Sequence, residues 1–179
     1  MAATAEQLRA GLSHVRAAPA DDGTLELIVR RPAVDEREVL EDAELDVRLG
    51  LVGDSWSRRG TRPNPKSQVA VMNARAAALI AGEREHWPFA GDQLYVDLDL
   101  SVDNLPPGTR LSIGSAVVEV TDQKHLGCEK FTARYGAEAR AFVNAPEGVA
   151  LNLRGINTRV VRSGTVRRGD VVRKLPAGA

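Results

Sequence analysis

Cysteine, histidine and aromatic residues are scarce in this chain of 179 residues, which has one cysteine, three histidines and 4% aromatic residues. A single cysteine excludes an internal disulfide framework and fits a reducing compartment, so we expect a cytoplasmic protein. The histidines are scattered and no CxxC or HExxH spacing occurs, which argues against a structural or hydrolytic zinc site. The shortage of aromatic side chains argues against nucleic-acid binding, because single strands are bound largely by stacking.

Long apolar runs and the common nucleotide motifs are also missing. No stretch has the length that a bilayer span requires, so we expect no membrane association. The first 20 residues lack the continuous apolar core of a secretory signal. There is no GxGxxG, no GxxxxGK[ST] and no serine nucleophile elbow, and this excludes the best-known dinucleotide, P-loop and serine-hydrolase sites.

The 24 basic and 24 acidic residues cancel overall but are unevenly distributed. Residues 21–54 hold 4 arginines against 11 acidic residues, and residues 123–179 hold 11 basic against 4 acidic residues. The two segments either pair with each other inside the fold, or the basic one binds a small anionic ligand. Arginine forks suit phosphate oxygens, and the candidates lie near the C-terminus: Arg154, Arg159, Arg162, Arg167 and Arg168.

Hydrophobic spacing predicts two helices and two strands in the first half of the chain. One helix covers residues 5–17 and ends before Pro19, and a strand over residues 24–32 follows it. Residues 55–67 have no apolar periodicity and are expected to form a long loop. A strand over residues 68–72 then leads to a second helix, with Asn73 as its N-cap and Gly82 as its stop.

The second half of the chain predicts mainly short strands. We expect strands over residues 94–101, 109–114, 115–121, 149–155, 158–164, 165–169 and 170–175, with a tight hairpin at Gly114-Ser115. One helix is expected in between, carrying Phe131, Tyr135, Ala139 and Phe142 on one face and weakened by Gly136. Many closely spaced strands indicate a mainly β, barrel-like α+β fold. Residues 1–20 would form a helical extension and residues 21–176 a single domain.

Cys128 stands among cationic residues, with Lys124 and His125 before it and Lys130 after it. Neighbouring cations favour the thiolate, which is the reactive and metal-binding form of cysteine. Such a thiolate could attack an electrophile, carry a sulfane sulfur or bind a soft metal. A free cysteine is more often a small buried hydrophobe, so an inert core residue is the competing interpretation.

Several segments, in their order along the chain, carry a resemblance to a known family. They are LVGD at 51–54, QVAVMNARAAALIAG at 68–82, residues 90–121 with Gly91-Asp92, then Cys128, and LRGINTRVVRSGTVRRGDVV at 153–172. Together they resemble the MOSC domain, named for the C-terminal domain of molybdenum cofactor sulfurases and also found as small stand-alone bacterial proteins. The resemblance covers residues 24–175. Stand-alone members often carry histidine in the loop after LVGD, and this chain has none there.

The resemblance implies a barrel of short, mostly antiparallel strands with a few peripheral helices, which binds the molybdenum cofactor or handles its sulfur. The family's cysteine falls on Cys128, which would ligate molybdenum or carry a persulfide. Basic groups around it would hold the pterin phosphate or stabilise the thiolate: Lys124, His125, Lys130, Arg154 and Arg159. The pyridoxal-phosphate domain of the full sulfurases has no counterpart here.

The resemblance further implies that any enzyme activity would be molybdenum-dependent reduction of N-hydroxylated compounds or sulfur transfer. Either would require an electron-transfer or sulfur-donor protein as partner. The alternative is a non-catalytic β-barrel that serves as a binding or regulatory module, with Cys128 as a structural buried residue. The oligomeric state is left open.

Overall fold

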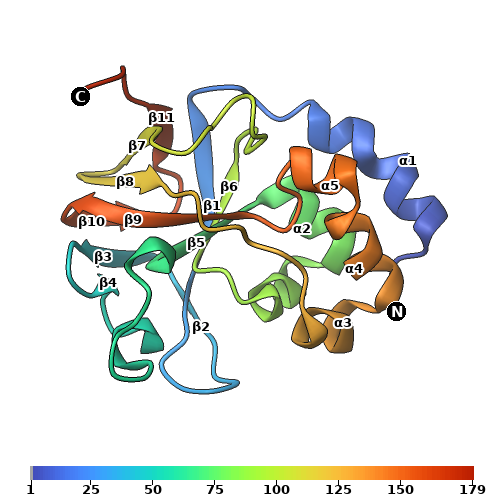
Figure 1. Ribbon diagram of the computed structural model, residues 1–179, viewed down its shortest axis with the longest axis horizontal. Coiled ribbons are helices and arrows are strands. Elements are labelled where there is room, and N and C mark those ends of the chain that lie inside the picture. Colours follow the sequence, from blue (N-terminus) through green and yellow to red (C-terminus); the bar gives the residue numbers. More distant parts are fainter. Residues whose placement is uncertain (1) are drawn as a thin grey trace.

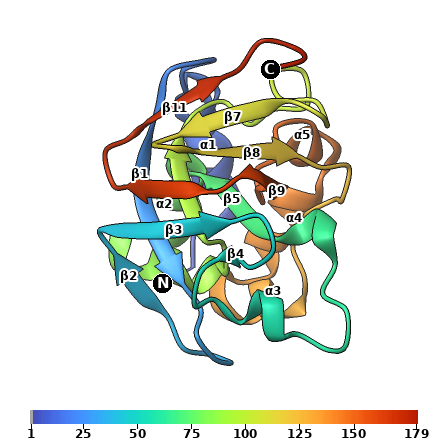
Figure 2. The ribbon, with the colours of Figure 1, turned by 90° about the vertical axis from the view of Figure 1, so that its left-hand side faces the viewer.

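The computed structural model describes residues 2–179 and contains a closed barrel of seven strands. Around the barrel the order is β1 (Gly23–Arg30), β6 (Leu94–Asp97), β5 (Val69–Asn73), β9 (Ile156–Arg162), β8 (Ala116–Val120), β7 (Arg110–Ile113) and β11 (Val171–Lys174). Strand β11 returns to β1, with Gly23 opposite Val172, and this pairing closes the ring (Figure 2). Only β5 and β6 in this ring run parallel. The predicted barrel of mostly antiparallel strands is therefore confirmed.

Further strands and the helices attach to this barrel. Strand β2 (Glu38–Leu40) pairs with β1, and β10 (Gly164–Arg167), β3 (Asp42–Asp46) and β4 (Gly50–Leu51) form a separate small sheet. The helices gather on one side of the barrel (Figure 1): α1 (Ala5–Arg16), α2 (Ala74–Ala81), α3 (Glu129–Tyr135), α4 (Ala137–Asn144) and α5 (Pro146–Ala150). Three 3₁₀ helices lie in the connections: η1 (Ser55–Arg58), η2 (Pro65–Ser67) and η3 (Arg84–Ala90).

Two apolar cores share the strands that lie between the barrel interior and the helices. On β6, Leu94 and Val96 face the barrel interior whereas Tyr95 packs in the helical core. Strands β1 and β5 also contribute to both cores. A strand buried on both faces reads as a continuous apolar run, which is why VAVMN of β5 is buried throughout. Helix α1 joins the same helical core through Leu8, Leu12 and Val15.

The predicted cap of α2 is confirmed in atomic detail. The Asn73 side-chain oxygen accepts hydrogen bonds from the amides of Arg75 and Ala76 at 2.8 and 3.1 Å, and its Nδ2 donates to the carbonyl of Leu98. Because the first amides of a helix have no partner within the helix, this side chain satisfies two of them. It also joins the start of α2 to the end of β6.

Two sequence predictions were wrong. Residues 149–155 alternate between apolar and polar, which favoured a strand, but α5 and a turn occupy residues 146–154. Pro146 stands at the first helical position, where its fixed φ and missing amide favour helix initiation over pairing. The single helix predicted to carry Phe131 and Phe142 is divided into α3 and α4 at Gly136, whose φ of 91° lies outside the helical region.

The predicted loop over residues 55–67 is ordered by side-chain caps. Asp54 caps η1 through the amide of Trp56, and Asn64 caps η2 through the amide of Lys66. Trp56 is buried, so it anchors the loop to the body of the protein. Within residues 2–179, no helix combines the length and the apolar character that crossing a membrane requires.

Candidate functional site

Cys128 is exposed and lies on the wall of a cleft of about 730 Å³. The cleft is lined by the β1–β2 loop, η1, the end of η3, the first turns of α3, and Arg154. Its volume is within the range of small-molecule and cofactor sites. An exposed thiol is not the environment of a core cysteine, so the interpretation of Cys128 as a structural buried residue is not supported.

The cleft is strongly cationic. Six arginines and one lysine line it, against one aspartate, Asp35. The cations are Arg31, Arg37, Arg58, Arg59, Lys130, Arg134 and Arg154. Such a concentration of positive charge in a concave surface attracts an anionic ligand and fits its oxygens with guanidinium forks.

Arg154 belongs to a buried network at the Cys128 end of the cleft. Its Nη1 donates to Oδ2 of Asp92 at 2.5 Å and its Nη2 to the carbonyl of Ala90 at 2.7 Å. The guanidinium lies 5.1 Å from the ring centre of Phe131, in the range of a cation–π contact. Its Nε is buried and, within residues 2–179, has no hydrogen-bond partner. The structure therefore holds a buried, charged donor at the wall of the cleft with one N–H unsatisfied.

His125 contacts the other oxygen of the Asp92 carboxylate, with Nε2 3.0 Å from Oδ1. Burial alone would raise the pKa of Asp92, but Arg154 and His125 outweigh it and lower that pKa to about 2. Burial and the charge on Arg154 lower the pKa of His125, although Asp92 opposes them. At neutral pH the network therefore holds an ionised Asp92, a charged Arg154 and a neutral His125, whose Nε2 donates to the carboxylate.

Gly155 allows this network to form at the start of β9. Its φ is 115°, and a Cβ there would lie 2.6 Å from the carbonyl oxygen of Val71 and 3.1 Å from Oδ1 of Asp92. His125 Cδ2 would be 3.2 Å away. Only glycine fits both this backbone conformation and this close approach.

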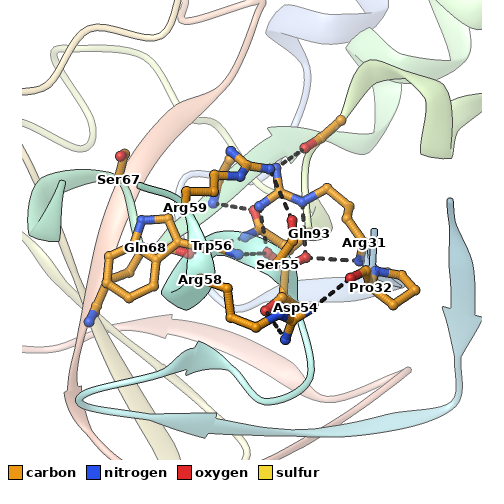
Figure 3. A network of polar contacts seen from close by, with 12 residues as sticks. Arg31, Pro32, Asp54, Ser55, Trp56, Arg58, Arg59, Ser67, Gln68 and Gln93 are labelled. Atoms are coloured by element: carbon orange, nitrogen blue, oxygen red, sulfur yellow. Dashed lines mark hydrogen bonds and ion pairs between the residues drawn. The ribbon is translucent and has the colours of Figure 1, made fainter. Parts of the chain in front are cut away.

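A second buried ion pair joins Arg31, which lines the cleft, to Asp54 (Figure 3). Arg31 donates to Asp54 through Nε and Nη2 at 3.0 and 2.8 Å, and its backbone amide donates to the same carboxylate. Burial opposes ionisation of Asp54, but the Arg31 bonds outweigh it, so the pKa of this carboxyl lies below its usual value. Arg31 Nη1 also donates to the carbonyl of Gly91 at 2.7 Å, which links the two ion pairs.

The environment of Cys128 favours its thiolate. Burial alone would raise the pKa of the thiol, but the backbone amides of Phe131 and Lys130 and the charge of Arg154 outweigh it. The pKa of Cys128 is therefore lower than that of an ordinary cysteine, and a larger fraction is ionised near neutral pH. This is the form that binds a soft metal or carries sulfur.

The structure brings together four of the six residues that the family resemblance assigns to the site. Cys128, His125, Lys130 and Arg154 line the cleft. Lys124 lines a separate cleft of about 220 Å³, which His125 also borders. Arg159 lies on β9 and pairs with Glu119 at 2.8 Å, and it lines neither cleft.

Sequence reasoning missed five cleft arginines: Arg31, Arg37, Arg58, Arg59 and Arg134. Arg31 and Arg37 fall in segment 21–54, whose net negative charge gave no indication of a basic site. Arg58 and Arg59 stand in the 55–67 loop, where four basic residues without apolar periodicity were the available signal.

The acidic segment 21–54 and the basic segment 123–179 form ion pairs with each other, but the cleft keeps an excess of positive charge. Arg134 meets Asp35 at 3.4 Å, Arg168 meets Glu41 at 3.2 Å, and Arg173 meets Asp22 at 2.5 Å. The cations of the cleft are nonetheless in clear excess. Within residues 2–179, no group of three or more histidine, cysteine or acidic side chains could hold a metal ion by itself.

Comparison with known proteins gives a family and a fold. A family model described as "MOSC domain" matches residues 53–173. The YuaD protein from Bacillus subtilis superposes with a TM-score of 0.61 at 19% identity, covering 85% of this chain and 94% of that one. YiiM from Escherichia coli superposes with a TM-score of 0.58 at 17% identity, covering 86% of this chain and 70% of that one.

YiiM from Geobacillus stearothermophilus is a further similar structure, with a TM-score of 0.55 at 12% identity and coverage of 88% and 77% of the two chains. At these identities the solved structures show that the fold is shared. No curated protein sequence matches at a significant level.

Proposed function

Because the chain belongs to the MOSC domain family, we propose that its cationic cleft holds a molybdenum cofactor with Cys128 as the protein ligand of the metal. The observation that carries the proposal is the position of Cys128, an exposed thiol with a lowered pKa, in a cleft lined by seven cations. A thiolate suits a soft metal, and guanidinium groups suit a phosphate.

The residues of the cleft fit such a group. A molybdenum cofactor brings sulfur ligands on its own pterin, so a single protein thiolate is sufficient and no cluster of protein ligands is required. Arg154 and Lys130 lie at the Cys128 end and would hold the pterin phosphate. The unsatisfied Nε of Arg154 is a buried donor on this wall, which a ligand oxygen would satisfy.

The bound cofactor would supply redox chemistry, and the chain's own residues would position it and control protons. Ionised Asp92 fixes the orientation of Arg154 and of the His125 ring. Neutral His125 offers Nδ1 as a proton acceptor, because its Nε2 proton is donated to Asp92. A reductase built on this site would require electrons from a partner protein.

The same thiolate supports sulfur carriage as a second role. A persulfide on Cys128 would need a donor of sulfane sulfur, such as a persulfide on a partner protein. The exposure of Cys128 favours this role as well, because a donor could reach the thiol. The cationic lining favours the cofactor role, since a persulfide brings at most one negative charge to a cleft lined by seven cations.

The test is retention of molybdenum after anaerobic loading. Wild-type protein, Cys128→Ser and the control Arg62→Gln are incubated with the cofactor, desalted and analysed for molybdenum per chain. Arg62 is exposed and does not line the cleft, so Arg62→Gln removes one arginine charge without changing the site. We expect retention by wild type and Arg62→Gln and about a tenfold loss in Cys128→Ser. Equal retention by all three, or none by wild type, contradicts the proposal.

A further inference from the structure

Four cations of the cleft have no carboxylate partner among residues 2–179: Arg37, Arg58, Arg59 and Lys130. Arg58 donates to the carbonyl of Pro32 at 2.6 Å, and Arg37 donates to that of Pro88 at 3.1 Å. Arg59 has one long contact, 3.4 Å from Nη2 to Oγ of Ser55. A phosphate monoester carries about −1.5 to −2 charges near neutral pH, so one such group leaves about half of these cations without a counter-charge.

The contacts along the cleft define two ends. Arg31 donates to the carbonyl of Gly91, and the next residue, Asp92, holds Arg154 at the Cys128 end. In the other direction the Arg31 guanidinium meets Asp54. Asp54 is the N-cap of η1, and Arg58 and Arg59 follow at the end of this helix (Figure 3). Along this series of contacts, the Arg31–Asp54 ion pair therefore lies between the Arg58–Arg59 end and the Cys128 end.

The arginines at and near the Arg58–Arg59 end repel one another. Burial, and then the charge of Arg31, lower the pKa of Arg59 although Asp54 opposes them. Burial, and then Arg134 and Arg31, lower the pKa of Arg37. The part of each shift that comes from neighbouring arginines is charge repulsion, and a bound anion would relieve it.

We infer that Arg58 and Arg59 form a second anion subsite, which binds a phosphate group other than the one held beside Cys128. This assignment rests on the proposed function, since it places a second phosphate in the cleft that would hold the cofactor. Two sources supply the same chemistry. The second phosphate belongs either to a nucleotide extension of the cofactor or to a phosphorylated substrate that reacts at the Cys128 end.

The subsite is tested by calorimetric titration of the protein, free of cofactor, with inorganic phosphate at constant ionic strength. We expect two phosphate sites in wild type, in Arg62→Gln and in Cys128→Ser. In Arg59→Gln one of the two sites weakens by about tenfold or more, the effect of losing a charge-assisted hydrogen bond. Arg59→Lys keeps the charge and weakens the site less. The same two affinities in wild type and Arg59→Gln, or one site in both, overturn the inference.

Arg59→Gln should fold normally, because the Arg59 side chain has one long contact to Ser55 in the described chain. A thermal melt that matches wild type checks this point. The double variant Arg58→Gln/Arg59→Gln should lose the second phosphate site. A second phosphate site that persists in this variant also counts against the inference.

The source of the phosphate is decided on holoprotein purified with its native cofactor. Acid release of nucleotide equal to the molybdenum content assigns the second phosphate to the cofactor. Molybdenum without nucleotide, with one phosphate site still open to titration, assigns it to a substrate. If molybdenum retention fails, the titration of cofactor-free protein still decides the subsite. A failed titration in turn leaves the retention result unaffected.

Discussion

At the scale of single residues, burial would raise the pKa of Cys128, but the backbone amides of Phe131 and Lys130 and, after them, the charge of Arg154 together outweigh it. Arg154 is held by Asp92 at 2.5 Å, and its charge helps to lower the pKa of the thiol. The cationic residues next to Cys128 in the sequence suggested a reactive cysteine, but one of them, Lys124, lines another cleft. The influential cation is 26 positions away along the chain, so spacing alone could not reveal it.

The thiol pKa gives a direct prediction for this residue. The rate of alkylation of Cys128 should rise with pH around a midpoint below that of an ordinary cysteine, because the thiolate is the reacting form. Arg154→Gln should move the midpoint upward, since it removes the positive charge near the sulfur. Stopped-flow reaction with a thiol reagent over pH 5 to 10 measures both curves. Overlapping midpoints for wild type and Arg154→Gln would show that Arg154 does not act on the thiol.

At the scale of elements, the sequence predicted most strands but not the start of β9. Residues 149–155 alternate like a strand, yet Pro146 initiates α5 and the chain turns through residues 151–154 before β9 begins. The turn places Arg154 in the cleft and Gly155 against Asp92. An alternating pattern over so few residues does not distinguish a short helix and turn from a strand, because the helical and strand periods differ too little over that length.

Gly155 supplies the prediction at this scale. Gly155→Ala should destabilise the fold by more than about 1–3 kcal/mol, the cost of a side chain in a strained backbone region, because it also forces a contact with Val71. The matched control is Gly108→Ala, where φ is 94° but a Cβ would meet nothing within 4 Å. Urea denaturation gives both free energies of unfolding. Equal losses for the two variants would mean that the close approach at Gly155 has no energetic consequence.

At the scale of the whole molecule, the cleft is assembled from segments that are distant in the sequence. Arg31 and Arg37 come from an acidic segment, Arg58 and Arg59 from a loop, and Arg134 from α3. The family order of motifs predicted the barrel correctly, since hydrophobic pattern and turns set the strand order. It could not predict which arginines converge, because that depends on how the β1–β2 loop and η1 fold against α3.

The buried Asp92 network predicts how stability depends on acid. The folded pKa of Asp92 is about 2, below the unfolded value of 3.8, so the unfolded chain takes up its proton first as the pH falls. Asp92 therefore contributes stability above about pH 4 that is lost as the pH falls toward 2. Asp92→Asn should be less stable at neutral pH by about 3–5 kcal/mol, since Arg154 loses its buried partner.

Asp92→Asn should also show a flatter decline of stability between pH 4 and 2, measured by denaturant unfolding at each pH. Asp122→Asn, which removes an exposed carboxylate paired with Lys66, should change neutral-pH stability far less than Asp92→Asn does, because solvent screens an exposed ion pair. An Asp92→Asn decline as steep as that of wild type would contradict the low pKa of Asp92.

The central claim, that Cys128 is the protein ligand of a molybdenum cofactor in this cleft, is tested most directly at the metal. X-ray absorption at the molybdenum edge counts the sulfur neighbours of the metal in cofactor-loaded wild type. The same measurement is made on the molybdenum that remains bound to Cys128→Ser. We predict one sulfur neighbour fewer in Cys128→Ser than in wild type. The same sulfur count in both would contradict the claim.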